Sequence, residues 1–235
     1  MSTTHGHPAG QTPGHDHDHA PIEERGEAVE FAILEAAIRE LSIEKGLFSA
    51  EDHRRFMEWY DKVGPTGGAR LVARAWVDPA FKQRLLADGV AACKEIGIDW
   101  MQPTGVGTPS DFTYLIVCEN TPKVHNVIVC TLCSCYPRPL LGMSPAWYER
   151  PTYRRRVVRW PRQVLAEFGT IIPPDVEVRV HDSNQKTRYI VLPMRPSGTE
   201  GWSEEKLATI VTRDTMIGVA LPSAEWTTDS TPGHA

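Results

Sequence analysis

The sequence Val129-Cys-Thr-Leu-Cys-Ser-Cys-Tyr-Pro137 contains three of the chain's five cysteines, whereas Cys93 and Cys118 stand alone. Thiolates are soft, strong donors, so three of them at this spacing indicate a transition-metal site. A tetrahedral structural zinc site normally takes two ligand pairs from separate turns, but this sequence has no second C-x-x-C and no H-x(3–5)-H downstream. A thioredoxin-type redox pair needs only two cysteines and would leave the third unexplained. The spacing therefore favours another kind of metal site.

The tight turn formed by Cys133, Ser134 and Cys135 lets the two cysteine side chains converge. The backbone nitrogens of Ser134 and Cys135 then point at the same place. Residues 130–135, which we call the claw, offer three sulfurs and two amide nitrogens and leave one metal position open. An amide nitrogen binds a metal only after losing its proton, which requires a strongly Lewis-acidic ion such as trivalent cobalt or iron. The same electron-rich environment makes the thiolates easy to oxidise.

The run V-C-T-L-C-S-C-Y-P resembles the metal-binding motif of the nitrile hydratase α-subunit and of the related thiocyanate hydrolase γ-subunit. The resemblance covers about residues 28 to 222. Further stretches that resemble family signatures are Tyr153-Arg154, Arg188-Tyr189, Arg195-Pro196, Gly198-Thr-Glu-Gly201 and Val211-Thr-Arg-Asp214.

The resemblance implies a ligand set of Cys130, Cys133, Ser134 and Cys135, with Cys133, Ser134 and Cys135 also taking part in catalysis. Within the family, the middle cysteine becomes a sulfinic acid and the last a sulfenic acid, which carries over to Cys133 and Cys135 and leaves Cys130 a thiolate. Thr131 matches the cobalt enzymes, so the implied cofactor is one low-spin Co(III) per chain, with Fe(III) as the alternative.

The implied chemistry is the addition of water to a C≡N group, and two substrates remain open. Thiocyanate, which gives carbonyl sulfide and ammonia, is favoured by residues 107–111, by Tyr136-Pro-Arg-Pro139 and by residues 182–189, where Lys186 suits an anion. A nitrile, which gives an amide, is favoured by residues 119–125. Tyr136 and Arg138 are candidates for the substrate pocket, although Tyr136 equally fits a packing role. A third interpretation of the claw is that the chain is a non-enzymatic metal-binding or redox-sensing subunit.

The resemblance also implies a hetero-oligomer with one or two partner subunits, in which a β-type subunit supplies arginines to the oxidised cysteines. A sulfinate, a sulfenate and two deprotonated amides concentrate negative charge that must be paired when it is buried. We therefore expect the isolated chain to be inactive or poorly metallated.

Composition sets the broad class of the protein. The chain has 235 residues, 41% of them hydrophobic, and a net charge of −5. No stretch approaches the ~20 apolar residues that span a bilayer, and no signal peptide is evident, so we expect a cytoplasmic protein that does not enter a membrane. The acidic balance gives no general attraction to nucleic acid. The run of arginines between Arg150 and Arg162 predicts either a solvated helix face or a docking surface.

We expect an α+β fold in which a helical arm precedes a layered α/β domain. Residues 1–25, rich in His and Asp, form a disordered tail that is either a loose metal-capturing segment or a solvated terminus. Residues 26–100 form the arm, 101–222 the metal-binding catalytic domain and 223–235 a flexible tail. Whether the arm packs on another subunit or covers the same core stays open, because its aromatic residues have no obvious partner.

Four helices are expected in the arm. The first helix begins near Glu27 and ends at Gly46, and the second opens with a capping box of Ser49 and Asp52. The third helix carries Leu71, and the fourth runs from Pro79 to Ile96. A linker covers residues 99–110. Strands are expected at 112–118, 127–130, 176–180 and 188–194, with a turn at 182–186 joining the last two and a final helix capped by Ser203.

Overall fold

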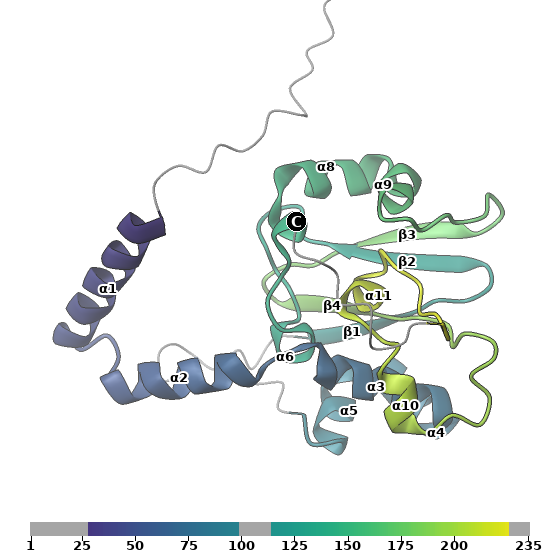
Figure 1. Ribbon diagram of the computed structural model, residues 1–235, viewed down its shortest axis with the longest axis horizontal. Coiled ribbons are helices and arrows are strands. Elements are labelled where there is room, and N and C mark those ends of the chain that lie inside the picture. The colour runs from purple at the N-terminus through teal and green to yellow at the C-terminus, as the bar shows by residue number, and fades with distance from the viewer. Residues whose placement is uncertain (1–27, 99–113, 226–235) are drawn as a thin grey trace, which may run out of the picture.

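The computed structural model describes residues 28–98 and 114–225. Two helices, α1 (Ala28–Glu44) and α2 (Ala50–Lys62), extend away from a layered body that contains all the other elements (Figure 1). The His-rich tail and the expected linker at 99–110 lie outside the described residues. No helix in the described part is long and apolar enough to cross a membrane.

The two extended helices end and begin where their sequences predict. Gly46 follows α1 with a φ of 69°, which a residue without a Cβ adopts at little cost. The predicted capping box at the start of α2 is present: the Ser49 hydroxyl accepts from the Asp52 amide, and the Asp52 carboxylate accepts from the Ser49 amide. In contrast, the predicted apolar face of α1 is left largely uncovered by the described residues, because Phe31 and Leu34 are more than half exposed.

The next three helices pack into the body. These are α3 (Pro65–Val77), α4 (Pro79–Ala87) and α5 (Gly89–Glu95), and Leu71, Phe81 and Leu85 belong to the same buried cluster as the strands. The single helix expected from Pro79 to Ile96 is two helices, because the side chain of Asp88 accepts from the Ala91 amide and caps a new helix. The contacts thus divide the expected 26–100 arm: α1 and α2 extend outward, and α3–α5 form a layer on the core.

Four strands form two parallel pairs. β1 (Tyr114–Glu119) pairs with β4 (Thr187–Leu192), and β2 (Val124–Val129) pairs with β3 (Glu177–Asp182). The turn after β3 does lead into β4, as expected, but these two strands bond to different partners rather than to each other. In Figure 1 the strands lie in the order β3, β2, β4, β1, between α8–α9 on one side and α3–α5 on the other.

The remaining helices are short. They are α6 (Arg138–Leu141), α7 (Ala146–Glu149), α8 (Pro151–Arg159), α9 (Pro161–Glu167), α10 (Glu204–Ala208) and α11 (Arg213–Ile217). Ser203 caps α10 as predicted, but α11 was not predicted. Gly218 ends α11 at a φ of 92°, where an added Cβ would lie 2.1 Å from the Asn126 carbonyl oxygen. This close approach fixes α11 against β2.

Candidate metal centre

The three cysteines of the claw converge directly after β2. Cys130 follows the last residue of that strand and is fully buried, whereas Cys133 is exposed and Cys135 half-buried. The Cys133 Sγ lies 3.4 Å from the Cys130 Sγ and 3.2 Å from the Cys135 Sγ, and all three sulfurs lie within 4.8 Å of one another. As expected, a strand thus positions Cys130, and the turn after it brings Cys133 and Cys135 close to Cys130.

The two isolated cysteines lie away from the claw. Cys93 is fully buried on α5 and Cys118 is half-buried on β1, and burial raises the pKa of each thiol to about 12. A buried neutral thiol behaves as a small apolar side chain, as predicted for both.

Charge is distributed unevenly over the claw. The side chain of Cys135, then that of Cys130 and the backbone N–H groups of Cys135 and Ser134, lower the pKa of Cys133. Burial raises the pKa of Cys135 to about 12, contact with Cys133 adds to the rise, and the positive charge of Arg188 opposes it. Of these two cysteines, Cys133 therefore loses its proton more readily than Cys135. The backbone amides of Ser134 and Cys135 therefore lie close enough to the Cys133 sulfur to stabilise its negative charge.

An aspartate from the neighbouring strand holds the beginning of the claw. Asp182 is the register partner of Val129 in the β2–β3 pair. One of its carboxylate oxygens accepts from the Thr131 amide at 2.9 Å, and the other accepts from the Thr131 hydroxyl. Parallel pairing of the two strands thus places a fixed acceptor beside the residue that follows the first cysteine.

Two further side chains hold the backbone carbonyls of the claw. Arg154 on α8 donates from Nη1 to the Cys133 carbonyl oxygen at 3.1 Å. The Tyr148 hydroxyl on α7 donates to the Cys135 carbonyl oxygen, also at 3.1 Å. Neither was predicted as a site residue, although Arg154 lies in one of the family-like signatures and in the arginine run. Burial of a tyrosine with its hydroxyl satisfied is a three-dimensional property that the sequence does not reveal.

The two candidate pocket residues lie in different surroundings. Tyr136 is only 4% exposed and packs edge-to-face on Tyr148 with ring centroids 5.1 Å apart. Its hydroxyl has no hydrogen-bond partner among the described residues. Arg138 begins α6 and is half-buried. The Tyr136 ring thus packs within the body, whereas the side chain of Arg138 makes no hydrogen bond in the described part of the chain.

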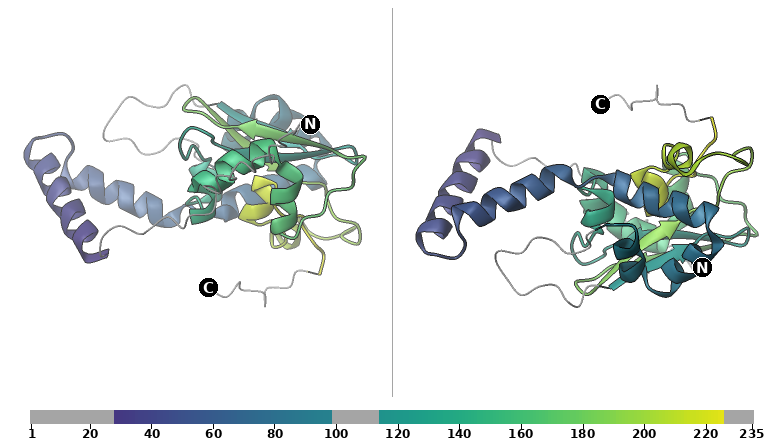
Figure 2. Two further views of the ribbon diagram at one scale, coloured as in Figure 1. Left: turned by 90° about the horizontal axis from the view of Figure 1, so that it is seen from above. Right: turned by 90° about the horizontal axis from the view of Figure 1, so that it is seen from below.

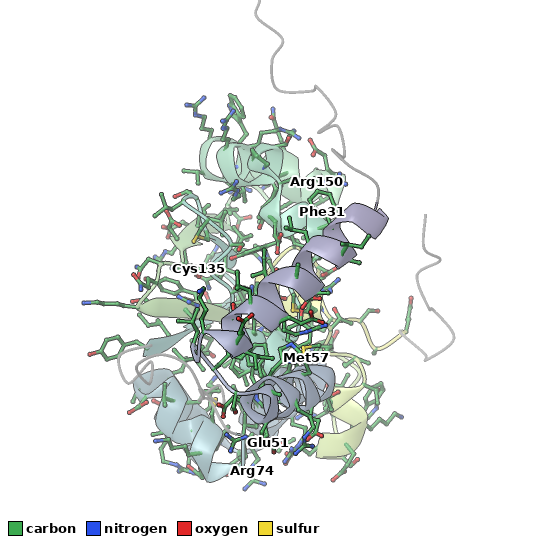
Figure 3. All side chains as sticks on the ribbon, turned by 90° about the vertical axis from the view of Figure 1, so that its left-hand side faces the viewer. Phe31, Glu51, Met57, Arg74, Cys135 and Arg150 are labelled. Atoms are coloured by element: carbon green, nitrogen blue, oxygen red, sulfur yellow. The ribbon has the colours of Figure 1, made fainter. Side chains whose placement is uncertain are left out.

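The claw and the extended helices lie on the same side of the molecule. Viewed from that side in Figure 3, α1 passes in front of the body, and Cys135 and Phe31 both lie toward the viewer. The perpendicular views in Figure 2 show α1 and α2 reaching beyond the body instead of folding back on it.

A family model for the nitrile hydratase α chain matches residues 29–220. The chain belongs to this family. Thiocyanate hydrolase subunit gamma of Thiobacillus thioparus is 60% identical over 205 residues, covering 86% of this chain and 84% of the relative. The low-molecular-weight cobalt-containing nitrile hydratase subunit alpha of Rhodococcus rhodochrous is 51% identical over 196 residues, covering 83% of this chain and 90% of the relative.

Solved structures of the nitrile hydratase α-chain family share the fold. A recombinant thiocyanate hydrolase with partially modified cobalt centers has a TM-score of 0.79 at 60% identity, covering 84% of this chain and 92% of that chain. An Fe-type nitrile hydratase double mutant from Comamonas testosteroni has a TM-score of 0.77 at 39% identity, covering 89% of this chain and 98% of that chain. The predicted α+β fold with a metal claw is confirmed.

The residues present fit a transition metal. Three thiols within 4.8 Å of one another supply soft donors, and the amide groups of Ser134 and Cys135 face the same place. Among the described residues, this cluster is the group of three or more His, Cys, Asp or Glu side chains close enough to hold an ion. The side-chain donors are all sulfur, with no His or carboxylate among them, which separates this cluster from hard-cation sites.

Proposed function

We propose that this chain is the metal-binding subunit of a cobalt enzyme that adds water to a C≡N group, with thiocyanate as its substrate. The observation that carries the proposal is the three-sulfur claw at the end of β2, in a chain 60% identical to a thiocyanate hydrolase subunit. The reaction is SCN⁻ + 2 H₂O → COS + NH₃ + OH⁻. A nitrile, converted to an amide, is the second candidate, and cobalt-containing nitrile hydratase subunits 51% and 52% identical to this chain support it.

In this proposal, the sulfurs of Cys130, Cys133 and Cys135 and the backbone nitrogens of Ser134 and Cys135 hold one low-spin Co(III), or alternatively Fe(III). The cobalt-containing relatives support the choice of metal. When bound, such an ion acts as a Lewis acid that polarises a C≡N group or lowers the pKa of water. The chain's own residues fix the donors: Asp182 holds Thr131, and Arg154 and Tyr148 hold the carbonyls on either side of Ser134.

The oxidation states belong to the same proposal. Cys133 becomes a sulfinic acid and Cys135 a sulfenic acid, whereas Cys130 remains a thiolate. The exposure of Cys133 and its lowered pKa favour oxidation there, and the full burial of Cys130 protects it. The sulfenate oxygen of Cys135 then serves as the nucleophile or base toward the substrate, and Ser134 contributes its backbone nitrogen.

A partner subunit completes the site. The claw lies open on the side from which α1 and α2 extend (Figure 3), and the oxidised claw needs positive charge once it is covered. One or two partners, including a β-type subunit that supplies arginines, form a hetero-oligomer with this chain in the cytoplasm. The groove between α1 and α2, with a volume of about 430 Å³ and lined by Phe31, Leu34, Ile38 and Phe48, is part of the surface that receives the partner.

The choice of thiocyanate is supported by positive side chains on the two segments that adjoin the claw, α6 and the turn after β3. Arg138 is half-buried in the helix that follows the claw, and its guanidinium has no partner in the described part of the chain. Lys186 lies in the turn between β3 and β4, four residues after Asp182, and its amide donates to the Asn184 side chain. An anionic substrate is drawn by such charges, whereas a neutral nitrile is not.

Co-expression of this chain with the subunits encoded beside it tests the proposal. The complex is expected to retain cobalt and to release ammonia from thiocyanate at a higher kcat/KM than it hydrates a small nitrile. A higher kcat/KM for the nitrile would select the second candidate. Stoichiometric cobalt without turnover of either compound would support a storage or sensing subunit, and stoichiometric zinc would contradict the proposed centre.

Replacement of one ligand tests the claw itself. Cys135→Ala removes a sulfur donor and the proposed sulfenate, so cobalt retention and turnover are both expected to fall to background. Cys118→Ala, which removes a thiol that lies outside the claw, is the matched control and should retain both. Cobalt analysis and ammonia release measure the two outcomes, and full activity in Cys135→Ala would contradict the assignment.

A further inference from the structure

Arg154 is the one arginine of α8 that bonds to the claw in the described structure. Its Nη1 donates to the carbonyl oxygen of Cys133, 21 residues away in sequence. That carbonyl belongs to the peptide whose nitrogen is the Ser134 nitrogen. The contact is therefore made to the same peptide group that contributes a proposed nitrogen donor to the metal.

The position of Arg154 is fixed by its neighbours on α8. The adjacent Tyr153 is buried, and its hydroxyl donates to the Ile128 carbonyl oxygen at 2.8 Å. Val157, one helical turn further along, is fully buried. Because Ile128 lies on β2, two residues before Cys130, the helix that carries Arg154 and the strand that carries the claw are tied together. The contact between Arg154 and the claw is therefore supported by a helix whose position is fixed, unlike the contacts of a mobile surface arginine.

The charge of Arg154 is not consumed by an acid. Arg156 pairs with Glu167, and Arg162 donates to the carbonyls of Ile172, Pro173 and Val176. Among the described residues, Arg154 makes no ion pair, and its Nε is buried without a hydrogen-bond partner. A guanidinium that is half-buried and lacks a carboxylate retains its positive charge for a nearby negative group.

A peptide nitrogen that binds a metal carries negative charge, and resonance shares this charge with the carbonyl oxygen of the same peptide. A cationic donor on that oxygen gives a stronger hydrogen bond than a neutral one. We infer that Arg154 is a positioning residue of the metal centre: it holds the Cys133–Ser134 peptide in place and balances, from within this chain, part of the charge of the metal-bound claw.

The inference rests on the proposed metal centre, and the test keeps the two separate. Cobalt-loaded complexes carrying Arg154→Gln, Arg154→Lys or the control Arg155→Gln are transferred to excess chelator, and the loss of the sulfur-to-cobalt absorption is followed with time. Arg155 is exposed and has no hydrogen bond among the described residues. If the parent complex holds no cobalt, the proposed function has failed; the inference is judged only against a parent that does.

Arg154→Gln is expected to lose cobalt about tenfold or more faster than the parent, as is typical when a residue that orients metal ligands is removed. Arg154→Lys, which keeps the charge but not the planar donor, is expected to lose it about threefold faster. Arg155→Gln should match the parent. Loss rates equal to the parent in both Arg154 variants would overturn the inference, and so would equal loss in Arg155→Gln. Should Arg154→Gln fail to assemble, Arg154→Lys decides on the same criterion.

Discussion

Helices α1 and α3 both carry large apolar side chains, but these side chains lie in opposite environments. On α3, Leu71 and Val72 are 1% exposed, whereas on α1 Phe31 and Leu34 are 58% and 54% exposed. Both helices are described by the structure, so the difference lies in what covers them. The core of this chain covers α3, and nothing in the described part of the chain covers the apolar face of α1.

An exposed apolar face of this kind has a cost unless another molecule covers it. Since α1 and the claw lie on the same side of the body (Figure 3), one partner subunit could bury both the apolar face of α1 and the claw. The body buries its own core and positions the sulfurs, whereas in the proposed complex the extended helices contribute to the partner interface. Changes to the body should alter stability or metal binding, and changes to α1 should alter assembly.

The largest expected effect is on assembly. Ile38→Asp places a charge in the groove between α1 and α2, where it would be buried against the partner without a counter-charge. Co-purification with the partner subunits is expected to weaken about 100-fold or more, because a buried unpaired charge is among the costliest interface changes. Titration of the separated subunits measures it.

Ala32→Asp is the matched control for this change. It introduces the same charge on α1 at an exposed position outside the set of residues that line the groove. The control should assemble as the parent does. If Ile38→Asp assembles equally well, the apolar face of α1 is not the partner surface.

The second prediction compares how a substitution in the body and one in α1 change the free energy of unfolding. Leu85→Ala creates a cavity in a core where Leu85 is 1% exposed, so the free energy of unfolding should fall by about 2–5 kcal/mol. Leu34→Ala should change it by less than about 0.5 kcal/mol in the isolated chain, because that side chain is already in water. Urea unfolding followed by circular dichroism compares the two. A similar loss in both variants would mean that α1 is part of the core.

Local signals predicted the helix ends well. At the starts of α2 and α10, the side-chain oxygens of Ser49 and Ser203 each accept a hydrogen bond from a nearby amide, so sequence alone locates these caps. The break at Asp88 has the same chemistry but was missed, because the apolar residues on either side of it continue a helical pattern. The 26–100 boundary was not predictable from periodicity, since an apolar face does not say whether its cover is the same chain.

Strand pairing and the outer contacts of the claw depend on distant residues. The run from β3 to β4 has a short turn, but β3 bonds to β2 and β4 to β1 because these pairings bury the apolar strands in one core. The convergence of the claw sulfurs was predicted from spacing, since three cysteines within a stretch of six residues can meet in one turn. Asp182, Tyr148 and Arg154 reach the claw only through this tertiary arrangement, so their contacts were not visible in the sequence.

A smaller effect tests how the β2–β3 pair supports the claw. Asp182→Asn removes the negative charge that accepts both the amide and the hydroxyl of Thr131. Cobalt loss to a chelator is expected to quicken about tenfold, in line with other residues that orient metal ligands. Asp175→Asn is the control, because Asp175 is exposed and pairs with Lys123 instead. Equal rates of cobalt loss in the two variants would show that the hydrogen bonds from Thr131 to Asp182 do not help to retain the metal.

The smallest effect concerns how α2 is stabilised without a core. The hydrogen bond from the Ser49 side chain, then that from its backbone and that from Arg55, lower the pKa of Asp52 to about 2. Because the pKa of the folded state lies below the ordinary value of 3.8, the cap stabilises the helix above pH 3.8 and is lost as the pH falls through about 2. The start of α2 thus depends on local charge, whereas α3 depends on burial.

Backbone NMR of the Ser49 amide, which donates to the Asp52 carboxylate, follows this titration. In the parent chain we expect no transition between pH 5 and pH 3. Ser49→Ala removes the largest contribution to the lowered pKa and should bring the transition into that window, and Arg55→Gln, which removes a smaller one, should move it less. A parent transition near pH 3.8 would show that the cap does not hold the carboxylate, and that α2 depends on a partner even for its first turn.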